Sequence, residues 1–326
     1  MSANAGGQKR RAPTRRIDGV LLLDKPQGLT SNAALQRVKR LYAAERAGHT
    51  GTLDPLATGL LPICLGEATK FGGELLEADK RYTATLKLGV TTTTGDAEGE
   101  VLEEKPVAVP QAQLHDVLAR FRGPISQVPP MHSAIKQGGQ PLYRLARQGQ
   151  TVERAPRQVV ILELNLLGFA PPQVILEVLC SKGTYIRTLA EDIGGLLGCG
   201  AHLTALRRTR IGSHGLDGSV SLEKLEALDK AGRDALLRPV DSLLAAWPEV
   251  VLDPDAARRF GNGMTVAVTG APLGADGRGP ARVYGDGASG RFFLGLATLD
   301  GGWLRPRRLV GGAAQETADT ASDNPP

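Results

Sequence analysis

A glycine-rich segment with a single carboxylate, residues 48–59 (GHTGTLDPLATG), restricts the fold of this chain more than any other stretch. Its three glycines permit backbone angles that are closed to other residues. Pro55, directly after Asp54, removes a backbone donor and bends the chain. We therefore expect a tight turn that presents Asp54, either as a turn cap or as a functional group. His49 is the only histidine beside that lone acid, so the segment suits a nucleophile better than a metal site.

Five runs of this sequence resemble motifs of one family, the TruB-type tRNA pseudouridine synthases. The run at residues 48–70 (GHTGTLDPLATGLLPICLGEATK) resembles the catalytic motif of that family. The other four are residues 19–28 (GVLLLDKPQG), 80–82 (KRY), 180–187 (CSKGTYIR) and 200–208 (GAHLTALRR). Any one run alone is a weak signal, but five in the family's order make chance a poor explanation. The resemblance extends from about residue 18 to residues 305–309.

The pattern of elements predicts an α+β fold. Residues 82–90 alternate between apolar and polar side chains, which predicts a half-buried strand with Tyr82 near its start. Residues 111–121 and 185–197 are typical of helices, and residues 203–211 of a strand. Strands and helices mix without regular βαβ alternation, which favours a largely antiparallel sheet. The resemblance implies the pseudouridine-synthase fold, a central sheet of this kind with flanking helices and the active cleft across its middle.

A domain boundary is predicted at Trp247-Pro248. Short strands separated by glycines beyond it are typical of a small β-barrel. By resemblance, this barrel is a PUA-like RNA-binding domain. The expected organisation is a disordered basic tail (1–16), a pseudouridine synthase catalytic domain (17–247), the PUA-like domain (248–310) and a disordered tail (311–326).

The net charge of +5 is unevenly distributed along the chain. Residues 1–16 carry five cations and no acid, and residues 309–326 carry three acids and no cation, so the body has a charge of only +3. A near-neutral body can still bind RNA through local patches. Residues 207–210 (RRTR) and 305–308 (RPRR) are the two candidates, with solvated surface as the alternative interpretation.

Composition argues against membrane insertion, disulfides and metal sites. No apolar run approaches the ~20 residues that span a bilayer, and the apolar run at 20–23 is too short for a signal peptide. We expect a cytoplasmic protein. Cys64, Cys180 and Cys199 lack CxxC spacing, which predicts reduced thiols. We also expect no metal and no other cofactor, because uridine isomerisation removes no electron and no group.

The resemblance implies roles for individual side chains. Asp54 is the implied nucleophile, or stabilising carboxylate, at the sugar–base junction. Arg187 occupies the position that pairs with the catalytic Asp, for which a guanidinium fork is well suited. Tyr82 would stack on the uracil and help to move the C5 proton. Tyr185 and Leu206 would line the pocket, although such residues are usually part of a core.

Two further expectations concern base flipping and charge. A uridine in folded RNA must leave its stack, at a cost of a few kcal/mol. The resemblance assigns this step to His49, which would fill the vacated space or hold the displaced nucleotide and would not act as a general base. A dry pocket raises the pKa of Asp54, whereas a neighbouring Arg187 lowers it.

Three functional hypotheses follow. The motifs favour a stand-alone synthase that converts uridine 55 in the tRNA T-loop, acting as a monomer on the T-arm without an obligatory protein partner. The relatives that use guide RNAs share these motifs, but nothing in the sequence calls for partner proteins. The second hypothesis is a tRNA-binding folding chaperone or ribonucleoprotein scaffold with incidental catalysis. The third is a phosphatase or ATPase, which needs magnesium and an Asp where this chain has His49.

Overall fold

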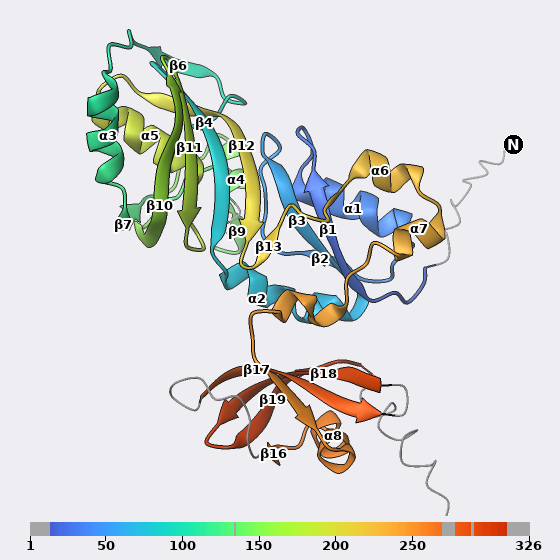
Figure 1. Ribbon diagram of the computed structural model, residues 1–326. Helices are drawn as coiled ribbons and strands as arrows, with labels where there is room; N and C mark the ends of the chain where they lie inside the picture. The colour runs from blue at the N-terminus through green and yellow to red at the C-terminus, as the bar shows by residue number, and fades with distance from the viewer. Residues whose placement is uncertain (1–13, 134, 269–277, 288–289, 312–326) are drawn as a thin grey trace, which may run out of the picture.

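The computed structural model describes residues 14–133, 135–268, 278–287 and 290–311. Figure 1 shows two separate sheets: a large one with helices around it, and a small curled one at the C-terminal end. A single chain crossing near residue 248 joins them. Within the described ranges, no helix is long and apolar enough to cross a membrane.

The large sheet runs in the order β14–β1–β3–β12–β4–β11–β10–β7, with β13 beside β12 and β2 beside β3. Neighbouring strands are antiparallel except at β1–β14 and β3–β12. The predicted α+β fold with a largely antiparallel sheet is therefore confirmed. The strands are β1 (Gly19–Lys25), β2 (Ala47–His49), β3 (Thr58–Leu65), β4 (Lys80–Leu88), β7 (Gly123–Gln127), β10 (Arg157–Ala170), β11 (Gln173–Cys180), β12 (Ala201–Ile211), β13 (His214–Gly215) and β14 (Val220–Ser221).

Helices flank both halves of this sheet. In Figure 1, α3 and α5 lie beside the half built from β10, β11, β4 and β12, while α1, α6 and α7 lie beside β1 and β3. The helices are α1 (Ser31–Leu41), α2 (Gly72–Glu77), α3 (Gln111–Ala119), α4 (Leu142–Arg147), α5 (Ile186–Leu197), α6 (Leu222–Ala227) and α7 (Lys230–Asp234), with 3-10 turns η1 (Gly66–Lys70) and η2 (Val240–Leu244). Two small hairpins pair β5 (Val90–Thr92) with β6 (Val101–Glu104) and β8 (Lys136–Gln137) with β9 (Gln140–Pro141).

Local sequence explains the helices that border the site. The Thr30 hydroxyl accepts a hydrogen bond from Ala33 N at the start of α1, as expected of an N-cap. Helix α5 ends at Gly198, whose φ of 81° suits a residue without a Cβ. The apolar face of α5 packs into the main core, which also contains the buried alternate residues of β4. The alternation predicted around Tyr82 is thus observed in β4.

A close crossing of two strands joins the halves of the large sheet. β12 pairs in parallel with β3, with Arg208 opposite Gly59. Gly59 has a φ of +98°, and a Cβ at this position would lie 2.3 Å from the Arg208 carbonyl oxygen. Only glycine fits here. This crossing fixes the end of the glycine-rich segment 48–59 against the strand that carries the arginine run.

The C-terminal sheet has its own core. Its order is β15–β17–β18–β19–β16, and residues of every strand share one hydrophobic core with Phe260 of α8. The small β-barrel expected at this end is confirmed as a curled sheet. Its elements are β15 (Glu249–Leu252), α8 (Pro254–Gly261), β16 (Val266–Ala267), β17 (Arg278–Gly287), β18 (Gly290–Asp300) and β19 (Trp303–Leu309).

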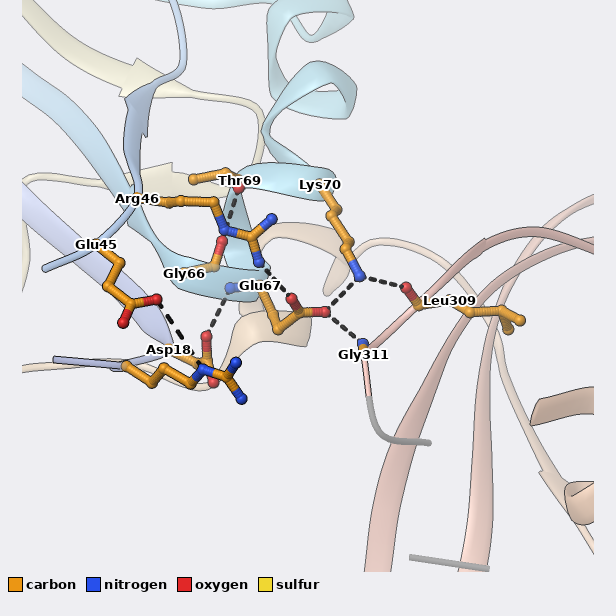
Figure 2. A network of polar contacts seen from close by, with 10 residues as sticks. Asp18, Glu45, Arg46, Gly66, Glu67, Thr69, Lys70, Leu309 and Gly311 are labelled. Atoms are coloured by element: carbon orange, nitrogen blue, oxygen red, sulfur yellow. Dashed lines mark hydrogen bonds and ion pairs between the residues drawn. The ribbon is translucent and has the colours of Figure 1, made fainter. Parts of the chain in front are cut away.

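Apolar and polar contacts join the two sheets. The ring centroid of Phe293 lies 5.4 Å from the ring centroids of Phe71 and Tyr284, and both ring pairs are tilted. Figure 2 shows the polar part, which centres on Glu67 of η1. Its carboxylate accepts from Arg46 at 2.8 Å, from Lys70 at 2.6 Å and from the Gly311 backbone N–H. The large sheet and the C-terminal sheet are therefore docked on each other through both kinds of contact.

The terminal segments fall largely outside the described residues. This holds for residues 1–13 of the expected basic tail and for residues 312–326 of the expected C-terminal tail. Arg15, near the end of the basic tail, is held by the body of the protein. Its guanidinium forms a two-pronged ion pair with Asp234 and donates to the Tyr42 carbonyl at 2.9 Å.

Candidate active site

The turn that carries Asp54 lies between β2 and β3 and is held from several sides. The Ser31 hydroxyl accepts from the Leu53 N–H at 2.7 Å and donates to the Leu53 carbonyl at 2.9 Å. The Gly28 N–H donates to the Pro55 carbonyl at 2.8 Å. The residues on both sides of Asp54 are thus bonded to the α1 region, which limits how far its carboxylate can move.

Arg187 places a buried cation against Asp54. Its Nη2 lies 3.0 Å from Asp54 Oδ2, and its side chain is only 5% exposed, whereas that of Asp54 is 40% exposed. Arg187 also donates to the Thr94 carbonyl at 3.1 Å and to the His132 carbonyl at 2.7 Å. Three separate segments therefore fix the guanidinium, while the acid opens to the cavity.

A second carboxylate, Asp96, shares this cation. Asp96 is 3% exposed, and its Oδ2 lies 3.5 Å from Arg187 Nε. Its other oxygen accepts from the Thr94 hydroxyl at 2.5 Å and from the Glu98 N–H at 3.1 Å. Asp96 has no distinctive sequence signal, because a Thr-Gly-Asp run in a loop is also typical of an ordinary turn.

Burial and neighbouring charges act on Asp54 in opposite directions. Burial raises the pKa of Asp54 above its usual range, Arg187 opposes that rise without cancelling it, and the negative charge of Asp96 adds to it. The two effects expected from the sequence, desolvation and a neighbouring cation, are both present. Asp96 makes a third contribution to the pKa of Asp54.

The predicted pocket residues line one cavity of about 280 Å³. Asp54, Arg187, Tyr82, Tyr185 and Leu206 all contribute to its wall. They come from the turn, from α5 and its N-cap, and from β4 and β12. Burial raises the pKa of both tyrosines, so their hydroxyls are protonated at neutral pH. The cavity thus combines aromatic and apolar side chains with a single carboxylate, Asp54, and with the cations Lys80, Arg187 and Arg208.

The side-chain amide of Gln127 in β7 bonds to both the N–H and the carbonyl of Tyr185. The sequence does not predict this residue as part of the site. The Tyr185 N–H donates to Gln127 Oε1 at 3.0 Å, and Gln127 Nε2 donates to the Tyr185 carbonyl at 3.3 Å. Gln127 is 2% exposed, so these bonds are shielded from water. The contact spans 58 residues of sequence and leaves no local signal.

His49 lies in β2 and does not line this cavity. It lines a neighbouring cavity of about 440 Å³, which shares Asp54 and Arg187 with the first. Burial, with a smaller effect of Arg208, lowers the pKa of His49, so its imidazole is neutral at pH 7. Its Nδ1 is buried without a hydrogen-bond partner among the described residues.

The basic patch expected at residues 207–210 does not form a common surface. Arg208 is 1% exposed and Arg207 is tied to Asp24 at 2.7 Å, so the prediction is wrong for this run. Alternation along β12 turns successive side chains to opposite faces, which places Arg208 inside. In contrast, Arg305, Arg307 and Arg308 of the second candidate patch are all exposed on β19.

In the part of the chain that the structure describes, neither the thiols nor the other potential metal ligands form a cluster that could bind a metal ion. Cys64, Cys180 and Cys199 are free and buried. Burial raises the pKa of Cys64 to about 12 and that of Cys180 to about 11, so both are neutral thiols. No group of three or more His, Cys, Asp or Glu side chains converges within the described ranges.

Comparison with known proteins adds the evidence of descent. Residues 39–186 match the N-terminal domain of TruB family pseudouridylate synthases, residues 187–245 match a tRNA pseudouridylate synthase B C-terminal domain, and residues 248–310 match the C-terminal region of pseudouridine synthase II TruB. The chain is 56% identical over 315 residues to the tRNA pseudouridine synthase B of Ralstonia nicotianae, covering 95% of this chain and 99% of that protein. The chain belongs to the TruB family of pseudouridylate synthases.

Other TruB relatives and solved structures agree with this assignment. The tRNA pseudouridine synthase B of Burkholderia lata is 55% identical over 311 residues, covering 95% of each chain. Pseudouridylate synthesis is an isomerisation, so this TruB-family chain is an isomerase. Among solved structures, a Cbf5–Nop10–Gar1 complex aligns with a TM-score of 0.66 at 26% identity, covering 91% of this chain and 80% of that one. An H/ACA ribonucleoprotein bound to a substrate RNA containing 2′-deoxyuridine aligns with a TM-score of 0.68 at 25% identity, covering 90% and 84%.

Proposed function

We propose that this TruB-family chain converts uridine 55 in the T-loop of tRNA to pseudouridine, with Asp54 as the nucleophile. One observation carries the proposal: the Asp54 carboxylate opens into the cavity while Arg187 holds it from the buried side at 3.0 Å. The family and the names of its relatives, which are tRNA pseudouridine synthases, support tRNA as the substrate.

The reaction breaks the N-glycosidic bond, turns the uracil and forms a bond from C1′ to C5, after which the C5 proton leaves. Asp54 supplies an electron pair at the sugar–base junction and is regenerated at the end. Arg187 stabilises the charged form of this carboxylate and fixes its direction. No electron is gained or lost, so the residues of the cavity can carry each step.

Three side chains form the base-binding wall in this proposal. Tyr82 stacks on the uracil and assists the loss of the C5 proton. Leu206 packs an apolar surface against the ring, and Tyr185 closes the side next to Arg187. His49 acts outside this chamber, as a neutral residue beside the neighbouring cavity that takes the space of the extruded base.

The organisation of the chain fits a protein-only enzyme. We assign catalysis to residues 17–247 and RNA binding to the PUA-like residues 248–310, whose exposed Arg305, Arg307 and Arg308 supply phosphate contacts. The partner is the T-arm of tRNA. The enzyme acts as a monomer in the cytoplasm, without an obligatory protein partner.

A pair of tRNA transcripts tests the site of action. One contains uridine at position 55 and the other cytidine there, and both carry tritium at C5 of their uridines. The enzyme should release one tritium per molecule from the first tRNA and none from the second. Equal release from both would contradict position 55. Faster folding of the first tRNA without any release would favour the chaperone hypothesis.

A further inference from the structure

Arg208 is a buried cation beside the candidate active site that the reaction scheme does not use. It is 1% exposed and is the largest of the fully buried side chains among the described residues. Its Nε donates to the Leu60 carbonyl at 2.8 Å, and its Nη2 donates to the Gly51 carbonyl at 3.1 Å. One guanidinium therefore connects β3 with the turn that carries Asp54.

The same side chain faces Tyr82. Arg208 and Tyr82 are directly opposed on β12 and β4, so their side chains lie on one face of the sheet. The guanidinium partly offsets the effect of burial on the pKa of Tyr82. Both residues line the cavity that holds Asp54. Arg208 thus bonds to the turn that carries Asp54 and faces Tyr82 across the sheet.

The buried charge of Arg208 destabilises the folded state. Burial lowers its pKa, and Tyr82 is the one titratable group among the described residues that favours its charged form. No ion pair joins it to a carboxylate within the described ranges, unlike Arg187 or Arg207. A buried cation without a carboxylate destabilises a fold relative to an apolar side chain. What Arg208 contributes instead is a link between three segments: it bonds to Leu60 of β3 and to Gly51 of the turn, and it faces Tyr82 of β4.

We propose that Arg208 is a positioning residue, which fixes the Gly51 end of the catalytic turn relative to Tyr82 and so sets the distance between Asp54 and the stacked base. Gly51 lies three residues before Asp54 and close to the guanidinium, since a Cβ there would be 3.5 Å from Arg208 Nη1. The inference rests on the proposed function, because it takes Asp54 and Tyr82 to act on opposite sides of one uracil.

Arg208→Lys keeps the charge but cannot reach the Leu60 and Gly51 carbonyls at once, since a lysine lacks the planar fork. With enzyme in excess, the rate constant for conversion of bound tRNA should fall about ten- to a hundredfold, because small misplacements of reacting groups have effects of that size. The Kd for tRNA should stay within about threefold, because a side chain that is only 1% exposed is too buried to contact phosphates. Arg208→Gln, which removes the charge and the fork together, should lose at least as much rate.

Arg233→Lys is the matched control. Arg233 also joins two main-chain carbonyls from separate segments, those of Leu225 at 3.1 Å and Leu41 at 2.9 Å, but it lies in α7, away from the cavity. It should lose a comparable amount of thermal stability and keep the wild-type rate constant. All rates are measured well below the thermal midpoint of each variant, so that unfolding does not enter the comparison.

The outcomes separate this inference from the function on which it rests. A reduced rate constant with an unchanged Kd in both Arg208 variants supports positioning. A wild-type rate in Arg208→Lys, a loss that matches that of Arg233→Lys, or failure of both Arg208 variants to fold would overturn it in favour of a structural role. If wild-type enzyme converts the tRNA and only the Arg208 result fails, the proposed function stands. Inactive wild-type enzyme would instead contradict the proposed function.

Discussion

Arg187 and Asp54 form an ion pair of unequal burial, in which the guanidinium is 5% exposed and the carboxylate 40%. The Thr94 and His132 carbonyls hold Arg187 in place independently of Asp54. The positive charge is therefore already fixed before substrate arrives, as electrostatic preorganisation requires. Asp54 remains open to the cavity, as its proposed role of nucleophile requires.

The raised pKa of Asp54 predicts a stability cost of the active site. A carboxylate whose folded pKa lies above its unfolded value destabilises the fold once it is ionised. This penalty is absent below the unfolded pKa, grows as pH rises through the interval between the two values, and is complete above the folded pKa. Asp54→Asn should therefore unfold at a thermal midpoint about 1–4 °C higher than wild type at neutral pH.

Thermal unfolding followed over a pH series measures this difference. The advantage of Asp54→Asn should shrink as pH falls and disappear below about pH 4, where the unfolded Asp is protonated as well. A variant less stable than wild type at neutral pH would show that the bond to Arg187 outweighs desolvation.

Asp96 should tune the acid limb of the pH–rate profile. The negative charge of Asp96 raises the pKa of Asp54, and its carboxylate also pairs with Arg187. Asp96→Asn removes both effects, so the pKa of Asp54 falls and the acid limb moves to lower pH. The plateau rate should drop about tenfold or more, because Arg187 loses one of its anchors.

Single-turnover rates over a pH series check this expectation. Asp192→Asn is the control, since Asp192 also has a pKa raised by burial but does not act on Asp54. A limb that moves to higher pH in Asp96→Asn would contradict the shared-cation arrangement.

The strand crossing at Gly59 should tolerate no side chain. An alanine Cβ would lie 2.3 Å from the Arg208 carbonyl oxygen, and φ is +98°. Gly59→Ala should lose about 3 kcal/mol or more of unfolding free energy, because neither backbone can move without opening the crossing. Gly28→Ala has a similar φ of +81° but nothing within 4 Å of the new Cβ, so it should lose only about 1–2 kcal/mol. Denaturant titration compares the two, and equal losses would mean that the close approach does not matter.

Glu67 should stabilise the contact between the two sheets in a pH-dependent way. Burial tends to raise the pKa of Glu67, but its bonds to Lys70, Gly311 and Arg46 outweigh burial and lower it. Its contribution is therefore present above the unfolded pKa of a Glu and lost as pH falls through the lower folded value. Glu67→Gln should lose about 1 kcal/mol at neutral pH, allowing for solvent screening of its partly exposed partners.

An exposed ion pair gives the comparison for Glu67. Glu77 pairs with Lys182, and the two side chains are 63% and 57% exposed. Glu77→Gln should change stability by less than about 0.5 kcal/mol. Thermal unfolding at neutral and acid pH distinguishes the two variants. A Glu67→Gln protein as stable as wild type at neutral pH would show that the apolar contacts alone hold the sheets together.

Sequence patterns were informative where the chemistry is local. The alternation around Tyr82 predicted β4, and the glycine-rich turn with one acid predicted a presented Asp54. The family motifs named Tyr185 and Leu206, which line the same cavity as Asp54.

Contacts between distant segments left no such signal. Asp96 reaches Arg187 from a loop 91 residues earlier, and Gln127 holds the Tyr185 backbone from an edge strand. The arginine run at residues 207–210 predicts a basic patch that includes Arg208, because such runs usually face solvent. The burial of Arg208 follows from the alternation of β12, which the charge pattern alone does not show.

The most direct test of the central claim compares wild type with Asp54→Asn on tRNA carrying tritium at C5 of uridine, with no added metal. Release by wild type, none by Asp54→Asn, and tRNA affinities within a few-fold of each other are the results that the account predicts. Retained release by Asp54→Asn would contradict the role of Asp54 as the nucleophile.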